Sequence, residues 1–369
     1  MKKTVVKKPR NANLDLLRIF SMILIILLHS IDHSGVLEQA PFSSTAINFW
    51  VMLTYMLTQV CVNLYVLISG YFLVKSKFRL QKLVALWLEV AFYSFVIKLV
   101  FMITGYNAFS IPSLMSCLVP VFTGRYWFIT IYFGLYLVFP FLNILINAMN
   151  KRQHTMLNIT LFALMSVMVS IYPSFKGMNS GAGWGLAWFV VLYFAAAWFR
   201  LYFNRDKKFE PLCVWLALSL VVAFGYVFIG EKIAIARAFF SNMYRYDSVI
   251  AYISSLALLA LFINVKIKSA FINKIIIFIA PSILGVYLIH AHASFSPWSW
   301  EFLNMPQYMD TLLFPVIQIG VVLAIFAFCV VIDIVRRYTI GRVESSKFIV
   351  NICDKIEDKA RKLSYKYFE

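Results

Sequence analysis

Long apolar runs separated by short polar loops occupy nearly the whole chain. A helix needs about 20 apolar residues to cross the hydrocarbon core of a membrane, because each residue adds about 1.5 Å of rise. Helices are expected because a backbone in lipid must satisfy its own hydrogen bonds. The pattern therefore predicts an all-α, polytopic integral membrane protein with about ten transmembrane helices. The apolar segments are 13–33, 46–73, 83–103, 126–148, 155–173, 184–203, 211–230, 246–265, 275–292 and 311–335.

The lysines and arginines fall mainly in alternate loops between these segments. With ten spans, 27 of the 34 lie in the two terminal tails and the even-numbered loops, and 5 lie on the opposite side. Positively charged loops of membrane proteins face the cytoplasm. Both termini are therefore predicted to be cytoplasmic. The same asymmetry accounts for the formal net charge of +18, so we expect no nucleic-acid partner.

The composition is that of a membrane protein, since 62% of the residues are hydrophobic and soluble proteins contain about 45–50%. No room remains for a large soluble domain. We divide the chain into a ten-helix membrane domain at 1–337 and a basic cytoplasmic tail at 338–369. The five cysteines are scattered without a CxxC pair, so we predict neither a disulfide framework nor a metal site.

The C-terminal tail carries apolar residues at three- and four-residue spacing, with charged residues between them. This periodicity predicts an amphipathic helix that lies on the inner face of the membrane. A frayed tail is the alternative. The apolar positions are Ile349, Ile352, Ile356, Ala360, Leu363 and Tyr367.

The first apolar segment contains two ionisable groups, Arg18 and His29. Eleven residues of helix give roughly 16 Å of rise and about three full turns, so the two side chains share one stripe. Asp15 and Asp32 are each spaced to reach one of them. Such groups are costly in hydrocarbon and usually face the bundle interior or a water-filled path. Snorkelling toward lipid phosphates would explain Arg18 alone, but not a histidine above it on the same face.

Four stretches of the sequence resemble acyltransferase family 3, whose multi-span membrane enzymes carry Arg or Lys, ten residues, and then His in their first helix. In this chain that signature is Arg18–x10–His29, within NLDLLRIFSMILIILLHS. The other three stretches follow in the family's order, so the resemblance covers essentially the whole chain. They are NLYVLISGYFLVKSKFRLQKLVALW at 63–87, RYWFITIYFGLYLVFPFLN at 125–143 and APSILGVYLIHAH at 280–292.

The resemblance implies the transfer of an acyl group, commonly acetyl from acetyl-CoA, to a sugar hydroxyl of a cell-surface or lipid-linked glycan. Acyl-CoA is then a co-substrate, and no bound cofactor is expected. The partners implied are membrane lipids and the carbohydrate acceptor, in a bacterial plasma membrane. The sequence does not indicate the oligomeric state.

The catalytic residues that we predict lie on the first helix. His29 is expected to act as the general base for the sugar hydroxyl or as the nucleophile that carries the acyl group. Asp32 either fixes the tautomer of the imidazole or is a solvated loop carboxylate. Arg18 is expected to lie on the path from the CoA phosphates to His29.

A basic loop after the second span is the predicted site for the phosphates of the donor. It contains Lys75, Lys77, Arg79 and Lys82 and follows Ser69, Gly70 and Tyr71. Many members of the family have Arg-x-x-Arg here, whereas this chain has Arg79-x-x-Lys82. The lysine keeps the charge but cannot bind a phosphate group through two parallel hydrogen bonds as arginine can. A purely topogenic role is the alternative for each of these charges. Gly70 is small enough to allow another helix or a ligand to approach closely.

The predicted acceptor-binding residues are Tyr126, Trp127 and His290, at the opposite end of the spans. The two aromatic rings are suited to stacking on sugar rings, although interfacial aromatic belts are common. A structural hydrogen bond is the alternative for His290.

Two other classes of function are compatible with ten spans. A transporter or flippase for a lipid-linked glycan would also contain internal charges, but we find no internal repeat. A membrane sensor is the third class, and the chain shows no signalling domain. We therefore favour the acyltransferase.

Overall fold

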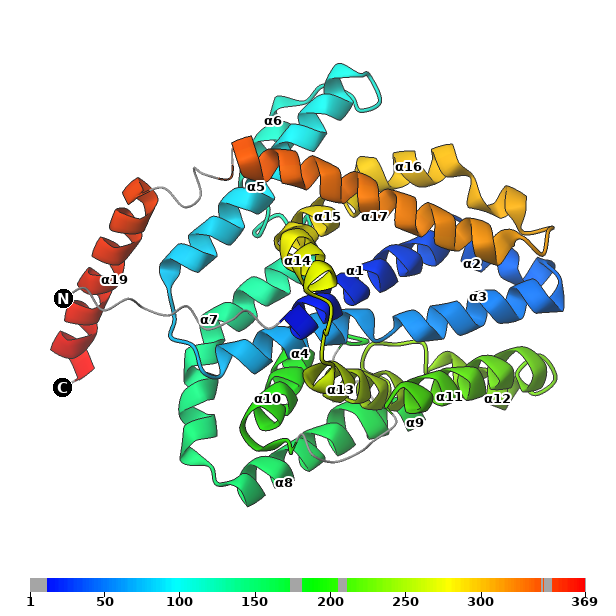
Figure 1. Ribbon diagram of the computed structural model, residues 1–369, viewed down its shortest axis with the longest axis horizontal. Coiled ribbons are helices and arrows are strands. Elements are labelled where there is room, and N and C mark those ends of the chain that lie inside the picture. Colours follow the sequence, from blue (N-terminus) through cyan, green and yellow to red (C-terminus); the bar gives the residue numbers. More distant parts are fainter. Residues whose placement is uncertain (1–11, 173–180, 205–210, 340, 342–346, 369) are drawn as a thin grey trace.

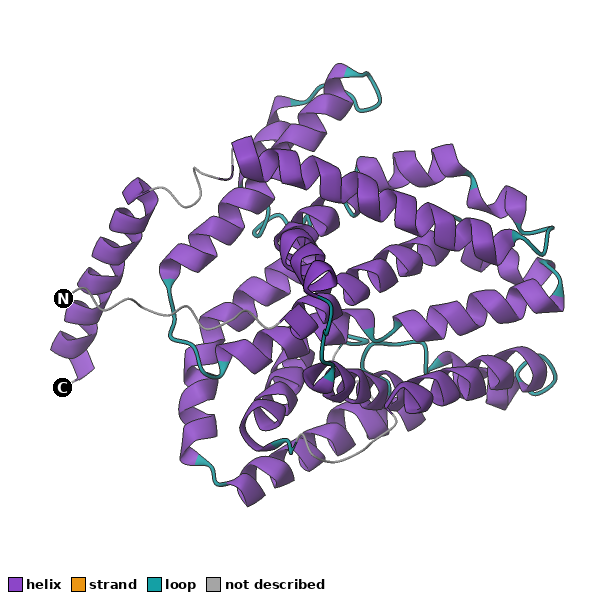
Figure 2. Cartoon of the chain, viewed as in Figure 1, coloured by secondary structure: helices purple, strands orange, loops and turns teal. Residues whose placement is uncertain are grey.

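The computed structural model describes residues 12–172, 181–204, 211–339, 341 and 347–368. Within these ranges the chain forms helices joined by loops and has no strand (Figure 2). The basic N-terminal tail that contributes to the predicted orientation lies outside the described residues. The predicted all-α, polytopic membrane architecture is confirmed.

Eight helical stretches of the described chain are long and apolar enough to cross a membrane. Two shorter apolar helices, α10 (Leu186–Tyr202) and α13 (Val249–Asn264), occupy the remaining two predicted segments. All ten apolar segments are thus helical, and the number that cross the membrane stays a prediction. The eight stretches are α1 (Ala12–Asp32), α3 and α4 (Thr45–Thr58 and Cys61–Leu73), α5 (Leu80–Ile103), α7 (Trp127–Ala148), α8 to α9 (Lys151–Ile171), α11 with its π-helical end (Pro211–Ile229), α14 and α15 (Ala270–Ile279 and Ile283–His290) and α17 (Phe314–Thr339).

The remaining helices lie outside these stretches. They are α2 (Val36–Gln39), α6 (Ile111–Met115), α12 (Ala234–Ser241), α16 (Phe295–Leu303) and α19 (Lys347–Phe368). The periodicity of the tail predicted the helix that α19 forms, and its position on a membrane surface stays a prediction. Because α17 continues to Thr339, the domain boundary that we placed after 337 falls within the last turn of this helix.

Polar side chains fix where several helices begin. The Ser44 side chain accepts a hydrogen bond from the backbone of Ile47 at the start of α3, and Ser248 does the same for Ala251 in α13. At α8, Asn150 and Gln153 form a reciprocal capping box. Such caps satisfy backbone N–H groups that have no partner within the helix. The capping box explains why α8 begins at Lys151, four residues before the predicted segment.

Helix α1 lies at the centre of the bundle (Figure 1). In the most apolar 18-residue windows, 72% of the residues are buried in α1 and 78% in the α3–α4 stretch, compared with at most 44% in the other spans. Helix α1 packs against α3, α4, α13, α14, α15 and α17. Protein therefore surrounds α1 on most sides, which allows it to carry ionisable groups that lipid would not accept.

Two glycines allow helices to approach closely. A Cβ atom on Gly70 of α4 would lie 2.8 Å from the Cβ of Ala196 in α10, so the predicted close approach at Gly70 is to a helix. A Cβ on Gly285 of α15 would lie 2.1 Å from Oδ1 of Asp333 in α17. Only glycine at 285 leaves room for this buried carboxylate.

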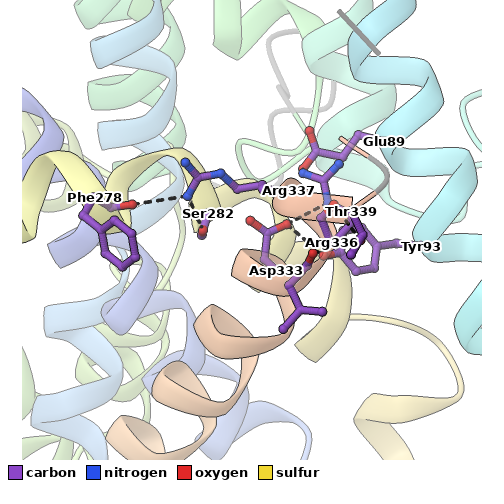
Figure 3. A network of polar contacts seen from close by, with 9 residues as sticks. Glu89, Tyr93, Phe278, Ser282, Asp333, Arg336, Arg337 and Thr339 are labelled. Atoms are coloured by element: carbon purple, nitrogen blue, oxygen red, sulfur yellow. Dashed lines mark hydrogen bonds and ion pairs between the residues drawn. The ribbon is translucent and has the colours of Figure 1, made fainter. Parts of the chain in front are cut away.

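A buried ionic network joins α5 to α17 (Figure 3). Arg336 donates from Nη2 to Glu89 at 2.8 Å and from Nε to Asp333 at 2.9 Å. The Tyr93 hydroxyl donates to the same Asp333 oxygen at 2.8 Å. A buried carboxylate is stable when such partners satisfy it. The network thus holds α17 against α5 on one side and, through Asp333, against Gly285 of α15 on the other.

Substitution of Arg336 is expected to destabilise the fold, because it would remove the cation that pairs with the buried Asp333 and with the partly buried Glu89. We expect Arg336→Met to lower the free energy of unfolding by about 3–5 kcal/mol. Thermal unfolding of the purified protein in detergent measures this as a lower melting temperature. The matched control is Lys274→Met, which removes one exposed cation from the neighbouring α14. Equal melting temperatures for the two variants would show that the network does not stabilise the bundle.

Candidate functional site

An internal cavity of about 610 Å³ runs along one face of α1. Its wall comes from α1, α4, α5, α7 and α15, with Trp184 and Tyr246 added from loops. We call the end near the loop between α4 and α5 the basic end, and the end near His29 the histidine end. The polar and aromatic residues that line this first cavity include Arg18, His29, Asp32, His33, Tyr65, Ser69, Ser76, Lys82, Arg125, Tyr126, Trp127, Tyr132, Tyr136, Trp184, Tyr246 and Tyr287.

Arg18 and His29 both face this cavity. Met22 and Ile25 line it between them, at the three- and four-residue spacing of one helix face. Because α1 is unbroken from Ala12 to Asp32, the rise between the two ionisable residues is roughly 16 Å. The shared stripe that the spacing predicts is therefore present, and it faces a cavity inside the bundle.

Asp15 and the aromatic residues of α4 hold Arg18 in place. The guanidinium donates to Asp15 at 2.8 Å and lies 5.6 Å from the ring centre of Phe72. The Arg18 backbone carbonyl accepts a hydrogen bond from Tyr65 at 3.2 Å. The Arg18 side chain remains 32% exposed, whereas that of Asp15 is 4% exposed. The Asp15 carboxylate thus balances the charge of Arg18, while the guanidinium still faces the cavity.

His29 lies in a group of three imidazole rings. Its ring centre is 4.4 Å from that of His33, which stacks on it, and 5.0 Å from that of His290. Its Nδ1 atom is buried without a hydrogen-bond partner among the described residues. The ring is therefore held by packing, and it lines a cavity into which a substrate atom can be brought. This is the arrangement that a base or a nucleophile requires.

Asp32 also lines the first cavity, and its carboxyl group interacts with the Tyr55 hydroxyl of α3. No hydrogen bond between Asp32 and His29 appears among the described residues. The structure thus places Asp32 near the histidine without the contact that would fix the imidazole tautomer. That role stays a prediction.

The predicted donor-binding residues divide between two cavities at the basic end. A second cavity of about 620 Å³ is lined by Lys77, Arg79 and Lys82 together with Asp354 and Glu357 of α19. Ser76 and Lys82 line both cavities, so the two adjoin at these residues. Glu357 also accepts a hydrogen bond from the backbone N–H of Leu80 at the start of α5.

Three predicted donor residues are placed differently from one another. Ser69 lines the first cavity, as expected. Lys75 is exposed and lines neither cavity at the basic end. Tyr71 is buried, and its hydroxyl accepts a hydrogen bond from Arg200 of α10 at 3.1 Å. The structure therefore does not bring Lys75 or Tyr71 to the first cavity.

The predicted acceptor residues lie at the histidine end. Tyr126 and Trp127 line the first cavity. Tyr126 donates to the backbone carbonyl of Leu288 at 2.8 Å, and Trp127 packs on Trp184 with ring centres 4.4 Å apart. His290 is 2% exposed and is not part of the cavity wall. It lies behind His29, with Nδ1 2.6 Å from the carbonyl of Val286.

Several residues of the first cavity were absent from the sequence-based prediction. Tyr132 and Tyr136 of α7 follow Phe128 at four-residue spacing, a periodicity that places all three on one helix face. This aromatic stripe could have indicated from the sequence that one face of α7 lines the cavity. Trp184 and Tyr246 come from loops distant in sequence, and no local pattern links them to Trp127.

Within the described ranges, no group of three histidine, cysteine or acidic residues is arranged to hold a metal ion.

The fold is that of a multi-pass membrane protein, and a cavity along its most central helix presents an arginine and a histidine. The family model for the acyltransferase domain of acyltransferase family 3 matches residues 11–334, so the chain belongs to this family of membrane acyltransferases. Comparisons with curated proteins and with solved structures found no match.

Removal of the His29 ring is expected to abolish acyl transfer, because no other imidazole both lines the first cavity and lies on the Arg18 stripe of α1 in the described chain. His29→Ala and His29→Gln should both reduce turnover by about 10²-fold or more, the lower range for loss of an acid–base group. The measurement is turnover by each purified variant, with its melting temperature as the control for folding. Near-normal turnover in a folded variant would contradict a chemical role for His29.

Proposed function

We propose that this protein transfers an acyl group, acetyl in the first instance, from cytosolic acyl-CoA to a sugar hydroxyl of a cell-surface or lipid-linked glycan. The observation that carries the proposal is the continuity of the first cavity. It extends from Lys82, beside the basic loop, past Arg18 to His29. Family membership supports acyl transfer in general, and the charges along the cavity support a phosphorylated thioester as the donor.

The donor would bind with its phosphates at the basic end. Lys77, Arg79 and Lys82 surround the second cavity, and phosphate groups bind to such clusters of cations. Asp354 and Glu357 lie in the same wall, so the tail helix limits the net positive charge there. The acyl-pantetheine arm would then extend into the first cavity past Ser76.

Arg18 would hold the middle of this arm. Its guanidinium faces the cavity roughly 16 Å from His29, which is too far to touch the reacting carbon. The planar group is suited to donating to amide carbonyls, because its N–H groups form a rigid fork. We assign Arg18 to positioning the donor.

His29 would perform the chemistry at the other end. As a general base, it takes the proton of the sugar hydroxyl while the hydroxyl oxygen attacks the thioester carbonyl carbon. The carbon–sulfur bond then breaks, and the CoA thiolate receives a proton. As a nucleophile, the imidazole first forms an acyl-imidazole with release of CoA, and the sugar hydroxyl then accepts the acyl group. Both routes place the same ring at the same point of the cavity.

The test of the function uses inverted membrane vesicles that contain the protein and acetyl-CoA labelled in the acetyl group. We expect label to appear in the glycan fraction and free CoA to accumulate in equal amount. Vesicles with His29→Ala are the matched control. Movement of glycan across the membrane without consumption of acetyl-CoA would instead identify a transporter.

The basic loop gives a separate prediction about the donor. The double variant Arg79→Ala with Lys82→Ala should raise the KM for acetyl-CoA about tenfold or more, with acceptor use largely unchanged, because two charge-assisted contacts to phosphate are lost. The matched control is Lys266→Ala with Lys268→Ala, which removes two exposed charges from another basic loop. If both double variants have the same KM for the donor, Arg79 and Lys82 do not bind it and act only in orienting the protein in the membrane.

A further inference from the structure

A third cavity, of about 480 Å³, lies beside the histidine end of the bundle. It is bounded by α2 and the 3-10 helix after it (Ala40–Phe42), by residues of α3 and α12, and by the π-helical end of α11. It is separate from the cavity along α1, since the two share no lining residue. Its principal lining residues are Asn48, Tyr55, Tyr226, Glu231, Arg237 and Tyr244.

Three tyrosine rings form the aromatic part of this third cavity. Tyr55 and Tyr244 stack with ring centres 5.2 Å apart and an angle of 15° between the ring planes. Tyr226 meets Tyr244 edge-on at 5.5 Å. The guanidinium of Arg237 lies 5.6 Å from the ring centre of Tyr226. Because the rings come from three separate segments, folding is needed to assemble this surface.

The same cavity offers both donors and acceptors of hydrogen bonds. Asn48 donates to Glu231 at 3.5 Å, a long contact that leaves both groups able to bind a ligand. The Tyr244 hydroxyl is buried without a partner among the described residues, and a buried polar atom of this kind is costly unless something satisfies it. One carboxylate and one guanidinium balance in charge, so the lining does not select an anion or a cation.

Tyr55 and Asp32 link the third cavity to the face of α1 that carries His29. Tyr55 lines the third cavity, and its hydroxyl interacts with Asp32, which lines the first cavity. Asp32 is three residues after His29, and residues at this spacing are neighbours on a helix surface. A ligand seated against Tyr55 would therefore lie one side chain away from the wall that contains His29.

We propose that the third cavity binds a neutral hexose unit of the acceptor glycan, an inference that rests on the proposed function. Aromatic rings stack on the C–H faces of a sugar, and mixed donors and acceptors match its hydroxyl groups. The donor arm occupies the first cavity under the proposed function, so a hexose held in the third cavity would anchor the acceptor glycan beside the histidine end.

The experiment measures transfer of label from acetyl-CoA to glycan extracted from cells that lack this protein. The concentration of extract that gives half-maximal transfer reports on the acceptor, and the Kd for CoA is measured separately by calorimetry. Tyr244→Ala should raise the half-maximal concentration about tenfold, the loss expected for one buried aromatic contact. Tyr244→Phe should raise it only a few-fold, because it keeps the ring and removes one hydrogen bond.

Arg237→Gln is the second test variant, because its side chain is exposed and its removal should not disturb folding. It should also raise the half-maximal concentration of extract, with the Kd for CoA unchanged. The matched control is Tyr172→Ala, at a tyrosine that is 63% exposed and lines none of the three cavities. Folded Tyr244→Ala and Arg237→Gln variants with the wild-type half-maximal concentration would overturn the inference. A wild-type protein that neither binds CoA nor transfers label would overturn the proposed function itself.

Discussion

The cost of placing an arginine and a histidine inside a membrane determines how this bundle is built. Neither group is stable against lipid, so each must be paired or must face a polar space within the protein. The structure meets this requirement by packing α1 against α3, α4, α13, α14, α15 and α17. Arg18 is paired with Asp15, and His29 stacks on His33 and lies at a tilt against His290. The central position of α1 is thus a consequence of the side chains that it carries.

The other buried charges follow the same rule but have a different effect. Arg336 forms ion pairs with Asp333 and Glu89 at the contact between α17 and α5. Their interaction holds α17 against α5. Arg18 and His29, by contrast, keep part of their surface toward a cavity. The molecule therefore contains ionic groups that fix the packing of helices and ionic groups that remain available to a ligand. The distinction is visible in exposure, since the side chain of Arg336 is 5% exposed and that of Arg18 is 32% exposed.

The sequence was sufficient to predict the helices and the polar face of α1, because both depend on local periodicity. Hydrophobic runs predicted the eight long apolar stretches together with α10 and α13, and the eleven-residue spacing placed Arg18 and His29 on one stripe. Helix boundaries were less accurate where a polar cap extends a helix beyond its apolar run, as Asn150 does for α8. The break between α3 and α4 within the 46–73 segment was also missed.

Contacts between distant segments were beyond the reach of the sequence. Nothing near Glu89 indicates that its partner is Arg336, and nothing near Trp127 indicates Trp184. Tyr71 closely precedes the basic motif in sequence, yet the helix turns its hydroxyl toward Arg200 of α10. For His290 the sequence left open an acceptor contact or a structural hydrogen bond, and the structure buries it against His29 with Nδ1 beside the carbonyl of Val286. Each of these outcomes depends on how one helix is rotated against another, which local patterns do not specify.

The central claim is that the donor enters at the basic end and reaches His29 through the cavity along α1. The most direct measurement is an electron cryomicroscopy structure of the purified protein with CoA bound. The account predicts density for the phosphates among Lys77, Arg79 and Lys82, an extended arm past Arg18, and the thiol beside the His29 ring. CoA bound outside this cavity, or with its thiol at the basic end and the histidine end empty, would contradict it.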